Sequence, residues 1–175
     1  MAEIGLHPEP DRIHYFAYGS NMSSARLLAR TPSARSLGRA SLQGYDLRFH
    51  KQGADGSGKC DAFHSGESAH CLHGVLYHLG LEEKSELDRI EGLGVGYESR
   101  TVTVTDSRGR RVEALTYVGI LLADDLQPWS WYREHVLVGA LEAGLPESYI
   151  QRIRSVVCLE DPDRDRDAQQ RAVHT

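Results

Sequence analysis

The sequence predicts an α+β fold in which a small sheet curls up or closes into a barrel. Three observations lead to this prediction. Strand-like segments come in a block, helical segments interrupt and follow that block, and the two kinds of segment show little regular alternation. A doubly wound fold depends on such alternation and therefore fits poorly. The length of 175 residues suits one domain, and 40% hydrophobic with 26% charged residues can supply a single core.

The first elements are expected to be a strand, a polar loop and a helix. Residues 13–18 are apolar and aromatic and run into turn-forming residues, which is typical of a buried strand. Good helix formers follow over residues 23–29, where Asn21 or Ser23 can cap the first turn and Pro32 lies just beyond the end. The polar loop is therefore expected between a strand end and a helix start.

Strand-like segments continue up to residue 79. Residues 44–50 and 71–79 have strand composition, and turns are expected over residues 53–58 and 64–68. We therefore expect several antiparallel strands in this part of the chain.

A helix and a hairpin are expected next. Residues 81–91 have helical spacing, and Gly92 is placed to end the helix. After a glycine-rich loop, valine and threonine alternate within residues 97–105, and a turn joins them to a partner strand over residues 112–120.

The last part of the chain is expected to be helical. Residues 130–143 form a helix ended by Gly144, and Pro146 opens another that continues to residue 157. From Asp161 onward Asp and Arg alternate without apolar anchors, so this tail is expected to be mobile.

Charge and composition exclude several classes of protein. Lys and Arg number 20 against 25 Asp and Glu, and the resulting net charge of −5 argues against a nucleic-acid surface. No apolar stretch approaches the ~18 residues of a membrane span, and the N-terminus has no apolar core of a secretory signal. The three cysteines form no CxxC motif, which favours reduced thiols and a cytoplasmic protein.

The polar loop is the first candidate for chemistry. It places consecutive backbone amides between a strand end and a helix start, where amides bind carboxylates or developing oxyanions. A simple turn with an Asn or Ser helix cap explains the same pattern, so both interpretations stay open. The loop residues are Tyr18, Gly19, Ser20 and Asn21.

Glu91 is the second candidate. It is the last residue of its expected helix and is followed by glycines rather than by a Lys or Arg partner. The negative end of the helix dipole, together with any burial, would raise the pKa of its carboxyl group and prepare it to act as a general base. An exposed glutamate at a frayed helix end is the alternative interpretation.

Two other groups of residues fit catalytic sites poorly. Ser20 lies outside any GxSxG elbow, so it is not predicted to be a hydrolase nucleophile with His14, His50 or His135 as its base. Five potential zinc ligands occur close together but without metal-site spacing, so no metal site is predicted. They are Cys60, His64, His70, Cys71 and His73.

Two motifs, in this order, resemble the gamma-glutamyl cyclotransferase-like family: YFAYGSN over residues 15–21 and LDRIEG over residues 87–92. The resemblance covers residues 13–157. Its further matches lie at residues 74–77, Tyr97, Tyr117 and residues 132–149.

The resemblance implies a small mixed β-barrel with flanking helices, formed by a catalytic domain over residues 13–157. Residues 1–12 and 158–175 would be mobile or peripheral ends. It also implies an enzyme of the gamma-glutamylcyclotransferase type, an acyltransferase or lyase that releases 5-oxoproline and an amine, amino acid or peptide from a γ-glutamyl compound. Glu91 is its implied acid and base. The implied substrate-binding residues are Tyr15, Phe16, Ala17, Tyr18, Gly19, Ser20, Asn21, Tyr97, Tyr117 and Tyr132.

The remaining expectations concern cofactors and partners. The resemblance implies no cofactor and no metal, a small γ-glutamyl molecule as substrate, and neither nucleic acid nor a membrane as partner. The oligomeric state stays open, with a homodimer among the options. Trp129 and Trp131, in a loop particular to this chain, are candidates to shape the pocket for one leaving group. A non-catalytic module that binds a small carboxylate is the alternative function, and a zinc-binding protein is a third.

Overall fold

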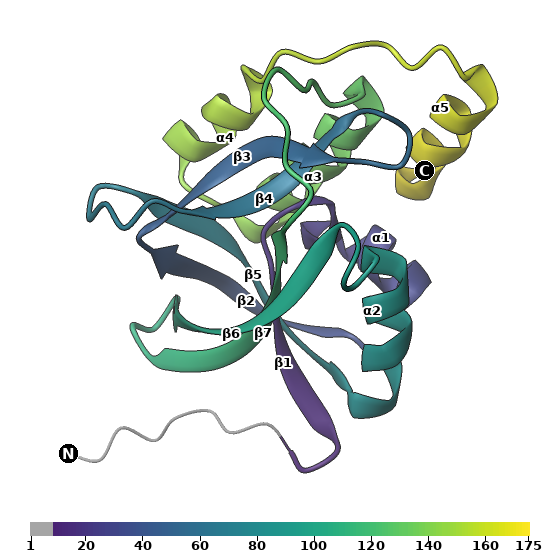
Figure 1. The fold of residues 1–175 in the computed structure, drawn as a ribbon. Coiled ribbons are helices and arrows are strands. Elements are labelled where there is room, and N and C mark those ends of the chain that lie inside the picture. Colours follow the sequence, from purple (N-terminus) through teal and green to yellow (C-terminus); the bar gives the residue numbers. More distant parts are fainter. Residues whose placement is uncertain (1–8) are drawn as a thin grey trace.

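The computed structural model describes residues 9–175, and the expectations for residues 1–8 lie outside this range. At its centre is a closed barrel of five strands in the order β1-β5-β2-β6-β7 (Figure 1). With helices around this barrel, the structure confirms the predicted α+β fold with a small mixed barrel. The barrel strands are β1 (Arg12–Ala17), β2 (Arg35–Gln43), β5 (Cys71–Gly80), β6 (Tyr97–Asp106) and β7 (Arg111–Gly119).

A parallel pair of strands closes the barrel. β1 pairs with β7 in parallel at Tyr15 and Leu115, whereas the other neighbouring strands run antiparallel. Thr116 Oγ1 adds a hydrogen bond of 2.8 Å to the carbonyl oxygen of Phe16. Because β1 and β7 are parallel, their carboxyl ends lie at one end of the barrel, and β6, antiparallel to β7, begins there with Tyr97. This end therefore gathers residues that are far apart in the sequence.

The hairpin of β6 and β7 confirms the alternation expected from the sequence. Val102 and Val104 of β6 are buried, while Thr101, Thr103 and Thr105 are exposed. Since successive side chains of a strand point to opposite faces, the valines enter the core and the threonines face solvent.

A second sheet of two strands lies outside the barrel. It consists of β3 (Tyr45–Gln52) and β4 (Gly58–His64), which pair antiparallel around the expected glycine-rich turn. The amide of Gly119, at the end of β7, donates a hydrogen bond of 2.7 Å to Oδ1 of Asp61 in β4. The hairpin of β3 and β4 is thus fixed to the same end of the barrel where β1 and β7 terminate.

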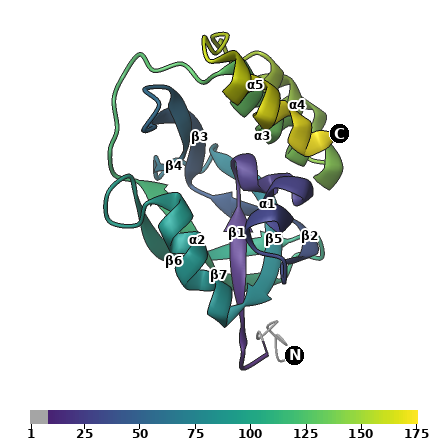
Figure 2. The same ribbon diagram turned by 90° about the vertical axis from the view of Figure 1, so that its right-hand side faces the viewer.

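Helices flank the barrel and cover this end. α1 and α2 lie along the barrel wall, and α3, α4 and α5 gather beyond one end of it (Figures 1 and 2). Two helices end at glycines with left-handed backbone, Gly92 at φ 70° and Gly144 at φ 63°, as the sequence predicts. The labelled helices are α1 (Ser24–Arg30), α2 (Lys84–Glu91), α3 (Ser130–Ala143), α4 (Glu147–Arg154) and α5 (Arg164–Arg171). Among residues 9–175, no helix has the length and apolar character that crossing a bilayer requires.

The second helix of the C-terminal region is shorter than expected. α4 ends at Arg154, three residues before position 157. The chain then turns back, and the amide of Ser130 donates a hydrogen bond of 2.8 Å to the carbonyl oxygen of Leu159. The amide of Leu159 in turn donates to the carbonyl oxygen of Pro128 at 3.0 Å. These long-range bonds tie the chain beyond α4 to the start of α3.

α3 packs closely against the polar loop that follows β1. Gly139 lies so near that an added Cβ would be 2.4 Å from Cβ of Met22 and 2.5 Å from the amide nitrogen of Ser23. Real Cβ atoms do not approach other atoms so closely, so the contact requires a glycine in the middle of α3. Ser23 caps α1 by accepting a hydrogen bond of 3.3 Å from the amide of Arg26.

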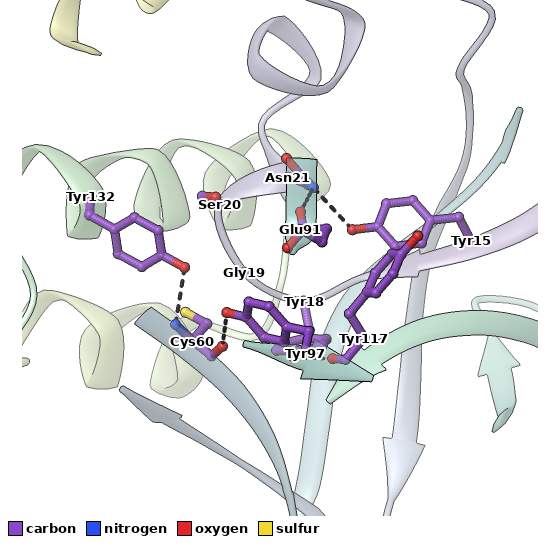
Figure 3. Close-up of a pocket in the computed structure, with 10 residues that line it drawn as sticks. All are labelled: Tyr15, Tyr18, Gly19, Ser20, Asn21, Cys60, Glu91, Tyr97, Tyr117 and Tyr132. Atoms are coloured by element: carbon purple, nitrogen blue, oxygen red, sulfur yellow. Dashed lines mark hydrogen bonds between the residues drawn. The ribbon is translucent and has the colours of Figure 1, made fainter. Parts of the chain in front are cut away.

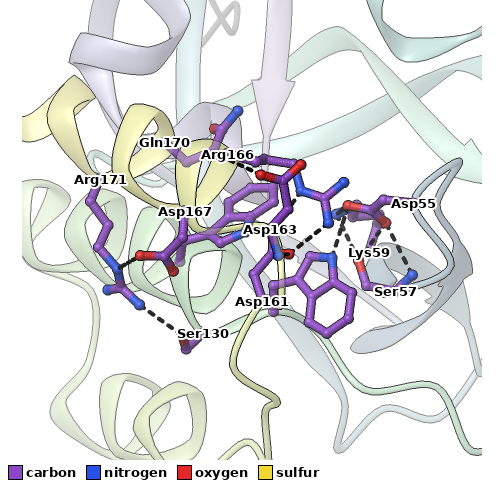
Figure 4. Close-up of polar contacts among 12 residues, drawn as sticks. Asp55, Ser57, Lys59, Ser130, Asp161, Asp163, Arg166, Asp167, Gln170 and Arg171 are labelled. Carbon is purple, nitrogen blue, oxygen red and sulfur yellow. Dashed lines mark hydrogen bonds and ion pairs between the residues drawn. The ribbon is translucent and has the colours of Figure 1, made fainter.

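The C-terminal segment is anchored, which the sequence does not predict. It forms the helix α5 (Arg164–Arg171), and the side chain of Asp161 before it is fully buried. Asp161 accepts hydrogen bonds of 2.6 and 2.7 Å from Arg166 and one of 2.8 Å from Nε1 of Trp131 (Figure 4). The expectation of a tail without anchors is wrong because the anchors are polar, and apolar patterning does not reveal them.

Trp129, like Trp131, uses its indole N–H to bind a buried or half-buried aspartate. Its Nε1 donates a hydrogen bond of 3.1 Å to Asp55 in the turn between β3 and β4. Trp129 therefore contacts the hairpin of β3 and β4, and Trp131 contacts the C-terminal segment. Neither tryptophan lines the pocket at the end of the barrel.

Candidate active site

A small pocket opens at the end of the barrel where β1 and β7 terminate. Its wall combines the polar loop, the end of α2, the start of β6, the end of β7, and single residues of β1, β4 and α3 (Figure 3). The parallel closure of the barrel brings these elements together. The lining residues are Tyr15, Tyr18, Gly19, Ser20, Asn21, Cys60, Glu91, Tyr97, Tyr117 and Tyr132.

Most of the residues that the resemblance implicates meet in this pocket, but two do not. Phe16 and Ala17 are buried in the core, with 0% and 1% of their surface exposed. The strand carries both side chains into the barrel packing, and neither residue lines the pocket wall, so their role in substrate binding stays a prediction. One lining residue, Cys60, was not among those implicated.

Glu91 is the carboxylate of the pocket. Only 15% of its side chain is exposed, and burial raises the pKa of its carboxyl group, in the direction that the sequence predicts. Arg30 and the hydrogen bond from Asn21 oppose this rise in pKa but do not cancel it. The expectation that Glu91 lacks a basic partner is wrong, because Nη1 of Arg30 lies 3.6 Å from its Oε1.

Asn21 connects the loop to Glu91. Its Nδ2 donates hydrogen bonds of 2.8 Å to Oε1 of Glu91 and 3.1 Å to Oη of Tyr15 (Figure 3). Its Oδ1 accepts a hydrogen bond of 3.1 Å from Arg30. Arg30 can only donate, so this contact fixes which side of the amide carries oxygen. The loop and the last turn of α2 are thereby held in one arrangement.

The backbone of the loop offers hydrogen-bond donors to the pocket. Residues Ser20–Met22 form a 3₁₀ turn, and within residues 9–175 the amides of Gly19, Ser20 and Asn21 find no protein acceptor. Gly19 packs against β4, where an added Cβ would lie 2.9 Å from Cβ of Cys60. Unpaired amides of this kind can bind a carboxylate or an oxyanion.

Ser20 has the environment of a hydrogen-bonding group rather than of a nucleophile. Its Oγ accepts a hydrogen bond of 3.1 Å from Nε of Arg26 in α1. Two of the histidines considered as bases are engaged elsewhere. His50 contacts Asp61 at 2.6 Å, and His135 lies 2.6 Å from His174.

Cys60 holds two tyrosines through its backbone. Its amide donates to Oη of Tyr132 at 3.0 Å, and its carbonyl oxygen accepts from Oη of Tyr97 at 2.6 Å (Figure 3). Burial raises the pKa of the Cys60 thiol to about 12, so the thiol stays protonated at neutral pH. The sequence contains no signal for this role, because it depends on the placement of β4.

The structure disperses the potential zinc ligands. Cys60 lines the pocket, whereas the ring of His64 packs on Tyr45 and that of His73 on Tyr149. In the described range, residues 9–175, no three His, Cys, Asp or Glu side chains form a group that could hold a metal ion.

Comparisons with known proteins agree with this architecture. Residues 71–153 match the AIG2-like family. The chain is 30% identical over 149 residues to a bovine protein named gamma-glutamylcyclotransferase, which covers 81% of this chain and 77% of that protein. This chain belongs to the gamma-glutamylcyclotransferase-like family. Its identity to the human gamma-glutamylcyclotransferase is 27% over 157 residues, which is 85% of this chain and 81% of that protein.

A solved structure shows the fold of this family. A protein named gamma-glutamyl cyclotransferase superposes with a TM-score of 0.83 at 23% identity, over 94% of this chain and 99% of that chain. A crystal structure of a human protein gives the same TM-score at 24% identity. The barrel and its helices are therefore those of the gamma-glutamylcyclotransferase-like family.

Proposed function

We propose that this protein is a gamma-glutamylcyclotransferase that releases 5-oxoproline from a γ-glutamyl amine, amino acid or peptide. The observation that carries the proposal is the pairing of a buried carboxylate, Glu91, with the unpaired amides of the loop in one pocket. The names of the bovine and human relatives support it.

The first step of the proposed reaction removes a proton from the substrate. The α-amine of a γ-glutamyl group has a pKa of about 8 and is largely protonated at neutral pH. Its nitrogen can attack only after a base has taken this proton. Glu91 is placed for that role, since its raised pKa makes its carboxylate a stronger base than an ordinary glutamate.

The second step closes a ring. The nitrogen forms a bond to the γ-carbonyl carbon, and the electron pair of the carbonyl moves to its oxygen. The amides of Gly19, Ser20 and Asn21 supply donors for this oxyanion. Since nucleophile and carbonyl belong to one molecule, holding the substrate curled contributes much of the rate.

The third step releases the leaving group. The oxyanion collapses, the bond between the γ-carbon and the amide nitrogen breaks, and the departing nitrogen takes the proton from Glu91. The ring nitrogen still carries two hydrogens after its attack, and it loses one of them to the Glu91 carboxylate, which passes this second proton to the released amine. The products are 5-oxoproline and an ammonium ion, and Glu91 is again a carboxylate. The steps balance without a metal, nucleotide or redox group.

Turnover of a panel of γ-glutamyl compounds tests this proposal. The wild-type protein should release 5-oxoproline from at least one γ-glutamyl amine, amino acid or peptide, and Glu91→Gln should lose most of that activity. Binding of the panel by calorimetry without any release of 5-oxoproline would instead identify a non-catalytic module for small carboxylates.

A further inference from the structure

A chain of hydrogen bonds on α2 reaches the pocket from outside its wall. Nζ of Lys84 donates to Oδ2 of Asp88 at 2.6 Å, and Oη of Tyr117 donates to Oδ1 of Asp88 at 2.5 Å. Asp88 lies one helical turn before Glu91 and is 17% exposed, whereas Tyr117 lines the pocket. Asp88 therefore contacts a pocket residue without lining the pocket itself.

The direction of these hydrogen bonds is fixed by chemistry. A lysine ammonium can only donate, and an aspartate carboxylate can only accept. The Tyr117 hydroxyl must therefore be the donor in its hydrogen bond with Asp88. What the Tyr117 oxygen has left for the pocket is a lone pair, which accepts hydrogen bonds.

Tyr15 has the opposite polarity. Its ring packs edge-on against that of Tyr117, with 5.9 Å between the ring centroids. Arg30 fixes the amide of Asn21, and Nδ2 of Asn21 donates to the oxygen of Tyr15. The hydroxyl proton of Tyr15 is therefore available to donate. The two tyrosines offer the pocket one acceptor and one donor.

We propose that Asp88 is a positioning residue that makes the Tyr117 oxygen an acceptor for an N–H of the substrate's α-amine. This inference rests on the proposed function for the nature of the substrate. With one N–H held by Tyr117 and one proton taken by Glu91, the nitrogen keeps its lone pair for the γ-carbonyl. Without Asp88, the Tyr117 hydroxyl turns its proton toward the pocket and opposes the amine.

A comparison of two ligands that differ only in the amine tests this role without requiring turnover. L-glutamine carries the α-amine, and 4-carbamoylbutanoate is the same molecule without it. NMR titration gives the ratio of their dissociation constants, which measures amine selectivity. The wild-type protein should prefer L-glutamine, and Tyr117→Phe should lower this preference by roughly ten-fold, the usual effect of losing a hydrogen bond to a charged group.

Variants at position 88 separate positioning from mere stability. Asp88→Ala should lower amine selectivity several-fold. Asp88→Asn combined with Lys84→Ala should restore most of it, because without the lysine the single amide oxygen is left to accept the hydrogen bond from Tyr117. In the double variant, Asp88→Ala should add nothing to Tyr117→Phe. Glu86→Ala is the matched control, since it removes an exposed carboxylate, paired with Arg89, from the same helix.

Several outcomes would overturn the inference. These are equal losses of affinity for both ligands in Asp88→Ala, additive effects in the double variant, and absence of amine selectivity in the wild-type protein. If Asp88→Ala does not fold, Tyr117→Phe must still lose selectivity. Amine selectivity that depends on Asp88, in a protein that turns over no γ-glutamyl compound, would reject the proposed function and leave this inference standing.

Discussion

Replacing Glu91 by Gln should lower the activity of this protein and raise its stability at the same time. Glutamine keeps the size of the side chain and an oxygen that accepts the hydrogen bond from Asn21, but it cannot take a proton. General acid–base catalysis contributes about 10²–10⁴-fold to rates, equal to about 3–5 kcal/mol of activation free energy. The kcat for release of 5-oxoproline should fall by this factor, with a much smaller change in KM.

The gain in stability follows from the raised pKa of Glu91. Burial raises this pKa in the folded protein even though Arg30 and Asn21 oppose it, and the ordinary value is 4.5. The folded state thus binds the proton more tightly than the unfolded state, and wild-type stability falls as pH rises from 4.5 through the raised pKa. The neutral Gln side chain escapes this loss. The variant should be more stable than the wild-type protein at neutral pH, and this difference in stability should vanish below pH 4.5.

Two measurements check this prediction. A 5-oxoproline assay gives kcat and KM, and thermal denaturation followed by circular dichroism across the pH range gives the difference in Tm. Glu113→Gln, which changes an exposed carboxylate on β7, is the control and should alter neither quantity. An unchanged kcat in Glu91→Gln would remove Glu91 as the base. A lower Tm at neutral pH would refute the electrostatic reasoning.

Three further predictions follow from packing and charge. Gly139→Ala should cost about 1–3 kcal/mol in urea denaturation and reduce activity, because its Cβ would press on Ser23 and shift the loop. Asp161→Asn should lower the Tm at neutral pH. Arg166 holds the pKa of Asp161 below its ordinary value of 3.8. The difference in Tm between Asp161→Asn and the wild-type protein should therefore narrow as the pH falls below 3.8. The thiol of Cys60, buried and with its pKa raised to about 12, should react with thiol reagents only after unfolding.

Each of these predictions has a result that would contradict it. Full activity and stability in Gly139→Ala would mean that α3 does not hold the loop. A gap between wild-type and Asp161→Asn that is constant with pH would show that the charge of Asp161 does not stabilise the C-terminal segment. Labelling of Cys60 in the folded protein, located by mass spectrometry, would mean that the pocket opens to the reagent.

Much of the local structure could be predicted because it depends on neighbouring residues. Gly144 ends α3 where the sequence places it, and the valines of β6 alternate with threonines as a half-buried strand requires. Glu91 could be recognised as a candidate base because it is itself the last residue of a helix whose end the following glycine predicts. The direction of its pKa shift followed from the same local argument.

Other parts of the site could not be predicted, because distant segments supply them. Arg30 reaches Glu91 from another helix, and the resemblance to a family did not indicate this contact. Cys60 clamps Tyr97 and Tyr132 through backbone groups that any residue possesses, so its side chain type carries no signal. Strand packing also decides that the side chain of Phe16, which belongs to the family motif, lies in the core.

The sequence by itself determined most strands and helices of this protein, its α+β class, and the loop and carboxylate that could carry chemistry. Hydrophobic spacing, helix caps and glycines act over a few residues, so these features depend on the local sequence. Only the tertiary structure decided that β1 and β7 close the barrel in parallel, that Asn21 joins Glu91 to Tyr15, and that Asp161 anchors the C-terminal helix. Such contacts join residues far apart in the chain. They form because a buried polar group is stable only when it has a hydrogen-bond partner.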